Sequence, residues 1–167
     1  MDDSLTEFEG TLQQLEQKVK SYLKISGNCA QTSFLALQEQ FGLDNGSILK
    51  ALTVFPGIAL RGETCGTVVG CLMAIGLVYG RERIDDWEGY TRALRHGRKF
   101  CRSFEKEFGS TMCGDIVESV FGKRYNLANP TEALEWQKAG AEEKCSGVIT
   151  AGVRIAARII VEGDQHT

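Results

Sequence analysis

Apolar residues recur at helical spacing along most of this chain, and the pattern predicts a protein built from α-helices. Within residues 1–26 the apolar positions repeat at alternating intervals of three and four, which places them on one stripe of a long amphipathic helix. These positions are Leu5, Phe8, Leu12, Leu15, Val19 and Tyr22. Segments of alternating β-branched residues are missing, and the chain contains only two prolines. We therefore expect an all-α fold.

The stretch from about 65 to 80 differs from the others because it is apolar on every side. It contains no charged residue between Thr67 and Tyr79, so a helix here has no face suited to water. Small residues repeat every four positions along it, at Gly66, Gly70 and Ala74. Such a strip lets a second helix approach closely. We expect this helix, capped by Glu63 or Thr64, to be the buried centre of a bundle of about seven or eight helices.

Capping and breaking residues delimit the other helices. Asn28 is a suitable N-cap and Gly42 a suitable end for the second helix, while Asn129 followed by Pro130 marks the start of a later one. With the apolar spacing, these signals predict helices at about 30–41, 47–55, 85–108, 113–121, 130–138 and 142–162. The whole chain, residues 1–167, is expected to form a single domain, with residues 163–167 as a disordered tail.

The longest of these helices, at 85–108, combines an apolar face with a basic one. Its predicted core face consists of Trp87, Tyr90, Leu94, Gly97, Cys101, Phe104 and Phe108. The opposite face carries Arg92, Arg95, Lys99, Arg102 and Lys106. We place His96 on the solvated side as well. A binding module for an anion, a nucleic acid or an acidic protein is one hypothesis for the basic face, although neighbouring glutamates dilute it and such faces usually serve solubility.

Composition and charge narrow the classes of function. A net charge of −3 gives no general reason to expect a nucleic acid or an anionic membrane as partner. The N-terminal segment MDDSLTEFEG is acidic and polar, unlike a secretory signal. The uncharged stretch 67–79 is shorter than the roughly 20 residues of a membrane-spanning helix. We therefore expect a cytoplasmic protein that neither inserts into a membrane nor binds nucleic acid.

Six cysteines are many for a reducing compartment, where structural disulfides are rare, and none belongs to a CxxC pair. Four of them are expected at helix starts, namely Cys29, Cys65, Cys113 and Cys145. A helix N-terminus favours the thiolate, which is the form that attacks disulfides and binds metals. The other two, Cys71 and Cys101, lie on apolar helix faces and are expected to fill space in the core.

The segments around these cysteines resemble a known family. The stretches GETCGTVVG and CLMAIGL, with GNCAQ upstream and MCGDI and KCSGV downstream, resemble the C-GCAxxG-C-C family of redox-active proteins from bacteria and archaea. The resemblance covers about residues 27–160. It implies that the family's CGAxxG motif corresponds to residues 65–70, with Thr67 in place of the usual alanine. It also implies that the family's four cysteines are Cys29, Cys65, Cys113 and Cys145.

The resemblance extends to the non-haem part of split-Soret cytochromes, which implies that an iron–sulfur cluster can be bound. The chain has no CxxCH motif, so covalent haem is not expected. Three uses of the four thiols stay open: an iron–sulfur cluster for electron transfer, a dithiol that cycles with a disulfide, and a redox-silent zinc site. We favour the cluster, because four cysteines match its usual ligand number whereas a dithiol needs only two.

Two charged neighbours of Cys65 are candidate accessory residues. Arg61 could stabilise a thiolate or a bound anion and Glu63 could transfer protons, although the pair also suits a simple salt-bridged turn near a helix start. The expected partner is an electron-transfer or thiol protein that the sequence does not identify. A homodimer is a further hypothesis, with the small-residue strip and the apolar first helix as its candidate interfaces.

Overall fold

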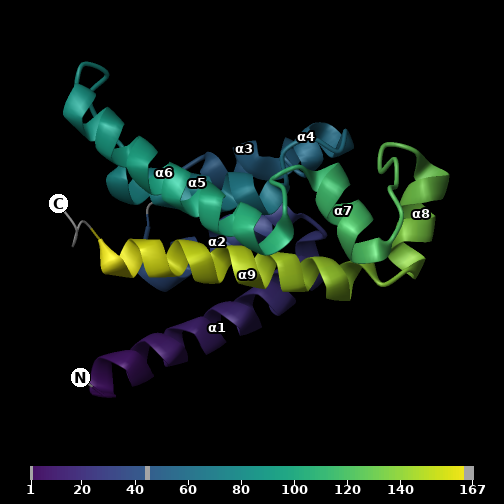
Figure 1. The fold of residues 1–167 in the computed structure, drawn as a ribbon, viewed down its shortest axis with the longest axis horizontal. Coiled ribbons are helices and arrows are strands. Elements are labelled where there is room, and N and C mark those ends of the chain that lie inside the picture. The colour runs from purple at the N-terminus through teal and green to yellow at the C-terminus, as the bar shows by residue number, and fades with distance from the viewer. Residues whose placement is uncertain (1, 44–45, 164–167) are drawn as a thin grey trace.

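The computed structural model describes residues 2–43 and 46–163 (Figure 1). Its helices are α1 (Asp2–Ser26), α2 (Cys29–Phe41), α3 (Ile48–Ala51), the 3-10 helix η1 (Leu52–Val54), α4 (Gly57–Leu60), α5 (Gly66–Tyr79), α6 (Trp87–Phe108), α7 (Cys113–Phe121), α8 (Pro130–Lys138) and α9 (Ala141–Glu162). Because α4 is a left-handed turn, the described residues contain eight right-handed α-helices and no strand. This confirms the all-α bundle. Apart from Gly163, the predicted disordered tail lies outside the described residues.

Five long helices form the core, and α5 lies in the middle of them. It packs against α2, α6 and α9, while α1 packs against α2 and α9 (Figure 1). The apolar stripe predicted for α1 is confirmed, since its buried side chains include Leu12, Leu15 and Val19. The shorter α7 and α8 lie at the end of the bundle where α9 begins (Figure 1). In the described residues, no helix has both the length and the apolar character needed to cross a membrane.

The small-residue strip of α5 explains how α2 can lie so close to it. Gly66 faces the Cys29 sulfur and Ala30, and Gly70 faces the Ala30 carbonyl and the Ser33 hydroxyl. A β-carbon at either glycine would collide with these atoms, so α2 rests directly on the backbone of α5. The predicted close approach is therefore made by a helix of the same chain. Since the α1 stripe is also buried, both surfaces that the sequence suggested for a dimer are covered within the chain.

Most of the predicted caps are present, but the cap of α5 is different. Asn28 accepts a hydrogen bond from the Gln31 N–H at 3.0 Å, and Asn129 caps α8 in a similar way. The N-cap of α5 is Cys65 rather than Glu63 or Thr64. The reason is that Thr64 pairs with Met112 in an isolated antiparallel β-bridge, which keeps the backbone before Cys65 extended. Cys65 thus stands at the start of α5.

The core face predicted for α6 is wrong over the first half of the helix. Trp87, Tyr90 and Leu94 are exposed, and the helix instead buries His96 and Phe100. Phe104 is buried, as predicted. His96, which the sequence placed on the surface, stacks on Tyr79 of α5 with ring centroids 3.8 Å apart. A stacked aromatic partner favours burial of the imidazole, and a hydropathy pattern does not register such a pairing. Of the predicted basic face, Arg95, Lys99, Arg102 and Lys106 are exposed and Arg92 is half-buried. Arg98 is exposed as well.

The expectation that α5 is buried on every side holds for its first half only. Thr67, Val68 and Cys71 are buried, whereas Met73 and Leu77 are each 39% exposed. The hairpin of α5 and α6 projects from the body only at its tip, where the loop after α5 and the start of α6 stand clear (Figure 1). The end of α5 is held against α9, because the Tyr79 hydroxyl donates to the Ile159 carbonyl at 3.0 Å. The neighbouring helices nevertheless leave Met73 and Leu77 partly in contact with solvent.

Two glycines of α5 provide a matched test of this packing. Gly70→Ala should lower the free energy of unfolding by about 1–3 kcal/mol, because the added methyl group collides with the backbone of α2. Gly76→Ala should raise it by about 0.5–1 kcal/mol, because the space around that position is open and alanine favours the helix. Urea unfolding measures both changes. A Gly70→Ala protein as stable as the wild type would contradict the close contact of α2 with α5.

Candidate redox site

Four cysteines from four separate segments come together at one end of α5. Cys29 is the first residue of α2, Cys65 is the N-cap of α5 and Cys113 is the first residue of α7. Cys145 is not at a helix start but one turn inside α9, which begins at Ala141. In addition to burial, a negative charge on Cys65 raises the pKa of Cys113 and of Cys145, so these sulfurs lie within electrostatic range of one another. The fold brings the predicted set together.

A short backbone pairing holds the start of α5 against the start of α7. The Cys113 N–H donates to the Glu63 carbonyl at 2.6 Å, and the Cys65 N–H donates to the Thr111 carbonyl at 2.8 Å. The Gly114 N–H donates to the Gly62 carbonyl at 2.9 Å on the same side. These bonds use the backbone groups that a helix start leaves free. They fix Cys65 and Cys113 relative to each other before any side-chain contact is considered.

The left-handed turn α4 lies against Cys113. Its residues Ile58, Ala59 and Leu60 have φ angles of 49°, 56° and 63°, a region that costs about 1–2 kcal/mol for each residue with a β-carbon. The Gly57 carbonyl accepts hydrogen bonds from the N–H groups of Arg61 and Glu63, which stabilises the turn. A β-carbon at Gly57 would lie 3.3 Å from the Cys113 sulfur. Strained backbone of this kind is concentrated at functional sites.

Cys29 and Cys65 form the central pair of the site. A hydrogen bond between their side chains lowers the pKa of Cys65, and the backbone N–H groups of Thr67 and Val68 and the Thr67 hydroxyl lower it further. Burial opposes these effects, and the resulting pKa of Cys65 is about 7, below the ordinary 9.0. The Thr67 hydroxyl is buried and has no hydrogen-bond partner in the described chain, and it lies near enough to Cys65 to act on its pKa. Cys65 is therefore the thiol that ionises first.

The other three thiols of the set are held in the neutral form. The hydrogen bond to Cys65, together with burial, raises the pKa of Cys29 well above its ordinary value. Burial, with the charge on Cys65, raises the pKa of Cys113 and of Cys145 to about 12. The expectation that every helix start favours a thiolate therefore holds only at Cys65. At Cys113 and Cys145, loss of solvent outweighs the helix dipole, and at Cys29 the interaction with Cys65 acts with burial.

The remaining predicted residues lie around this site. Cys71 is fully buried in the core and Cys101 is half-buried against it, as expected for packing residues. Arg61 and Glu63 form an ion pair at 2.9 Å on the surface, with the Arg61 side chain 69% exposed. This is the salt-bridged turn that the sequence suggested as the simpler interpretation. A part for either side chain in thiol chemistry stays a prediction.

A family model described as "Putative redox-active protein (C_GCAxxG_C_C)" matches residues 27–159, a range that contains all four cysteines of the site. The chain belongs to this family. The family description agrees with a site whose reactive groups are thiols, and the resemblance noted in the sequence is confirmed. No curated protein and no solved structure matches the chain.

The four family cysteines do not have the arrangement of a single-ion metal site. Among the described residues, no group of three or more histidine, cysteine or acidic side chains is placed to hold a metal ion. A zinc ion requires four sulfurs at about 2.3 Å from one centre. The donor set matches such a site in chemistry, but the positions of the sulfurs do not match it in geometry. An iron–sulfur cluster spreads its ligands over several irons and so accepts more widely spaced thiols.

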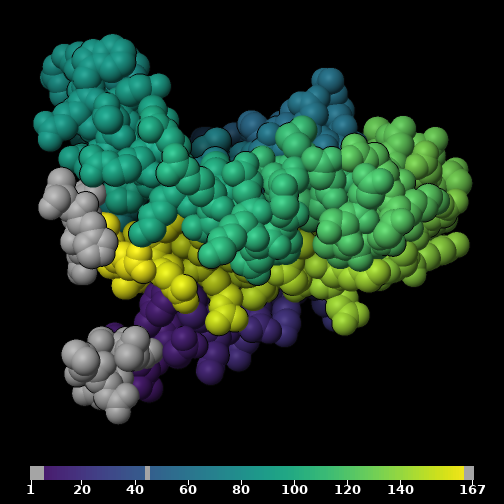
Figure 2. Space-filling model, in the orientation of Figure 1, coloured from purple at the N-terminus to yellow at the C-terminus, as the bar shows by residue number. Residues whose placement is uncertain are grey.

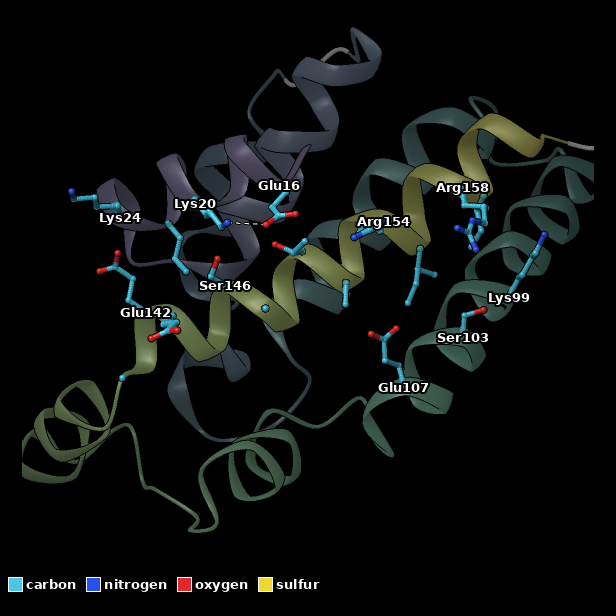
Figure 3. A pocket seen from close by; sticks show the side chains of 18 of the residues that line it. Glu16, Lys20, Lys24, Lys99, Ser103, Glu107, Glu142, Ser146, Arg154 and Arg158 are labelled. Atoms are coloured by element: carbon cyan, nitrogen blue, oxygen red, sulfur yellow. Dashed lines mark hydrogen bonds and ion pairs between the residues drawn. The ribbon is translucent and has the colours of Figure 1, made fainter. Parts of the chain in front are cut away.

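A cleft of about 1210 Å³ lies away from the thiols, along α9 between α1 and α6 (Figure 3). Among the described residues that line it, five are acidic, five are basic and none is a cysteine. Glu16 and Lys20 form an ion pair within it at 2.7 Å, and Arg154 and Arg158 project from α9 (Figure 3). The balanced charge favours neither an anion nor a cation, so the cleft offers no separate candidate for the redox chemistry.

Two features of the site were missed by the sequence predictions. The first is the α4 turn, for which the sequence offers only Gly57 and Gly62 as indications of positive φ. The other residues of the turn with positive φ are ordinary apolar residues, which rarely adopt it. The Thr67 hydroxyl was visible only as a substitution within the CGAxxG motif. The hydroxyl lowers the pKa of Cys65 only because it lies beside that thiol. Thr67 follows Cys65 by two residues at the start of α5, and this spacing permits such a position.

The low pKa of Cys65 predicts how its reactivity depends on pH. Alkylation by iodoacetamide, followed by peptide mass spectrometry, should increase with a midpoint near pH 7, because the thiolate predominates above the pKa in the folded protein. Thr67→Val removes the hydroxyl donor and should shift the midpoint upward, whereas Thr67→Ser should not. A midpoint at the ordinary thiol value of 9.0 would show that Cys65 is not activated.

Proposed function

We propose that the protein is a thiol redox protein in which Cys65 and Cys29 cycle between a dithiol and a disulfide. The observation that carries this proposal is the close approach of α2 to the start of α5, which puts the Cys29 sulfur against Gly66, the residue after Cys65, and lowers the pKa of Cys65. Attack on a disulfide requires a thiolate with a second thiol within reach, and the pair meets both requirements. All six cysteines are free, which fits a reducing compartment, and we propose the cytoplasm as its location.

The reaction that suits this pair is reduction of a disulfide in a partner. The Cys65 thiolate attacks one sulfur of the partner's disulfide, which forms a mixed disulfide and releases the second sulfur as a thiolate that takes up a proton. The Cys29 thiol then loses its proton and attacks the Cys65 sulfur, which releases the partner's remaining thiolate. Two electrons have moved from the dithiol to the partner. A dithiol reductant regenerates the pair by the same exchange in reverse.

An iron–sulfur cluster is a second candidate, because the dithiol uses only two of the four gathered thiols. Cys29, Cys65, Cys113 and Cys145 would be its ligands, and four thiolates match the usual ligand number. A bound cluster would supply one-electron transfer. The low-dielectric surroundings and the N–H donors near Cys65 would then tune its potential.

Purification without oxygen distinguishes the two candidates. The dithiol proposal expects a colourless protein that contains no iron, inorganic sulfide or zinc, and in which mild oxidation forms a Cys29–Cys65 disulfide detectable by mass spectrometry. A brown protein with visible absorption and matching amounts of iron and sulfide would contradict the dithiol proposal and support the cluster. Stoichiometric zinc without colour would contradict both.

Serine variants provide an independent test. Under the dithiol proposal, Cys113→Ser with Cys145→Ser should leave formation of the Cys29–Cys65 disulfide intact, whereas Cys29→Ser should abolish it. Under the cluster proposal, the double variant should lose the bound iron and the visible absorption. Cys101→Ser is the matched control, because Cys101 is half-buried and lies outside the set. It should behave as the wild type in both assays.

A further inference from the structure

The projecting hairpin of α5 and α6 carries an uncovered apolar face. Its exposed side chains, here called the apolar face, are Met73, Leu77, Val78, Ile84, Trp87, Tyr90 and Leu94. Trp87 is 69% exposed and Ile84 82% exposed. Figure 2 shows the end of the hairpin as a lobe that stands out from the rest of the surface. Large contiguous apolar patches are uncommon on the surface of a monomer and mark sites of association.

The hydrophobic pattern indicates that this face is made to be covered. Trp87, Tyr90 and Leu94 repeat at the spacing of one helix face, which is why the sequence predicted them to be in the core. The neighbouring helix α5 has no charged residue of its own. Gly76 lies on the same exposed side of α5, and the space around it is open, so that another helix can approach. In the described chain, the apolar side chains of the face all remain at least 37% exposed.

The face is also suited in composition to a protein interface. Tryptophan and tyrosine are enriched among the residues that contribute most to binding. The Arg81 guanidinium lies 5.4 Å from the centre of the Trp87 ring and 4.7 Å from that of Tyr90. These cation–π contacts hold both rings in place in the free protein. A partner would therefore meet a preorganised surface and lose less side-chain freedom on binding.

The charges along the hairpin are divided between an acidic tip and a basic stem, and this division favours one kind of partner. The tip, residues 81–88, has four acidic and two basic residues. The stem of α6, residues 89–103, has five basic residues and no acidic one. In the described chain, the side chains of Glu82, Glu88, Arg98 and Arg102 make no hydrogen bond or ion pair with other residues. An acidic tip and a basic stem on one hairpin complement the same hairpin turned end to end.

We propose that a second copy of the chain covers the apolar face, with the two hairpins packed antiparallel about a two-fold axis. Each acidic tip then lies against the basic stem of the other copy, and the two contacts are equivalent, as an isologous interface requires. A parallel arrangement would instead place the two basic stems together, and like charges across an interface disfavour association. The dimer hypothesis drawn from the sequence thus acquires a different interface from the two first considered.

The first test removes the apolar contacts. Wild-type protein should have the mass of a dimer in sedimentation equilibrium at micromolar concentration, and Leu77→Glu with Leu94→Glu should have the mass of a monomer. Both leucines are 38–39% exposed, so the variant should keep the circular dichroism spectrum of the wild type. Val161→Glu, at a 52% exposed position of α9 outside the face, is the control and should remain dimeric. A monomeric wild type, or a double variant that remains dimeric, would overturn the proposal.

The second test examines the antiparallel arrangement through charge reversal. Glu82→Arg with Glu88→Arg should weaken the homodimer at least about tenfold, because tip and stem are then both basic. Arg98→Glu with Arg102→Glu should also weaken it, because most of the net positive charge of the stem is lost and the introduced glutamates face an acidic tip. An equimolar mixture of the two variants should form a heterodimer, since the introduced arginines of one copy meet the introduced glutamates of the other, and the remaining tip and stem are unchanged. Failure of the mixture to associate, or homodimers of unchanged strength, would contradict the antiparallel pairing. Contact with an unrelated partner would not produce this rescue.

Discussion

The close approach of α2 and α5 is the contact on which the thiol site depends. At Gly66 the two helices are so near that a β-carbon would overlap the Cys29 sulfur, and at Gly70 one would overlap the backbone of α2. Ordinary side chains would hold the helices about 8–10 Å apart. The missing side chains therefore place Cys29 beside Cys65. The hydrogen bond between the two cysteines, and the low pKa of Cys65, follow from this approach.

Burial then decides how the charge is distributed among the thiols. A pocket of low dielectric disfavours every thiolate, and each negative charge raises the pKa of the next thiol. Cys65 ionises first because it collects the hydrogen bond from Cys29 and the N–H donors at the start of α5. Cys113 and Cys145 lack donors of this kind and stay protonated. One activated thiol among neutral neighbours is a suitable arrangement for ordered disulfide exchange, in which attack and resolution fall to different residues.

The chain maintains this pocket with backbone that is costly to form. Three consecutive residues with β-carbons adopt positive φ in α4, and the segment before Cys65 gives up helical geometry to pair with the segment before Cys113. Tertiary contacts on both sides hold these segments in place. The hairpin of α5 and α6 is also unfavourable for the isolated chain, since it leaves apolar side chains exposed to solvent. The first feature adjoins the thiols that would exchange with a partner's disulfide, and the second carries the face that a second copy would cover.

By itself, the sequence determined the all-α fold, most helix boundaries, the small-residue strip of α5 and the four cysteines, because these depend on local spacing and on residue type. Only the tertiary structure decided which faces are buried and which thiol ionises. His96 is buried because Tyr79 stacks on it, and Trp87 is exposed because its part of α6 extends beyond the bundle. Likewise, Cys29 and Cys113 both start helices, yet the pKa of Cys29 is raised by the interaction with Cys65 and by burial, and that of Cys113 by burial. Such outcomes depend on contacts between segments distant in the chain, and helical periodicity carries no information about them.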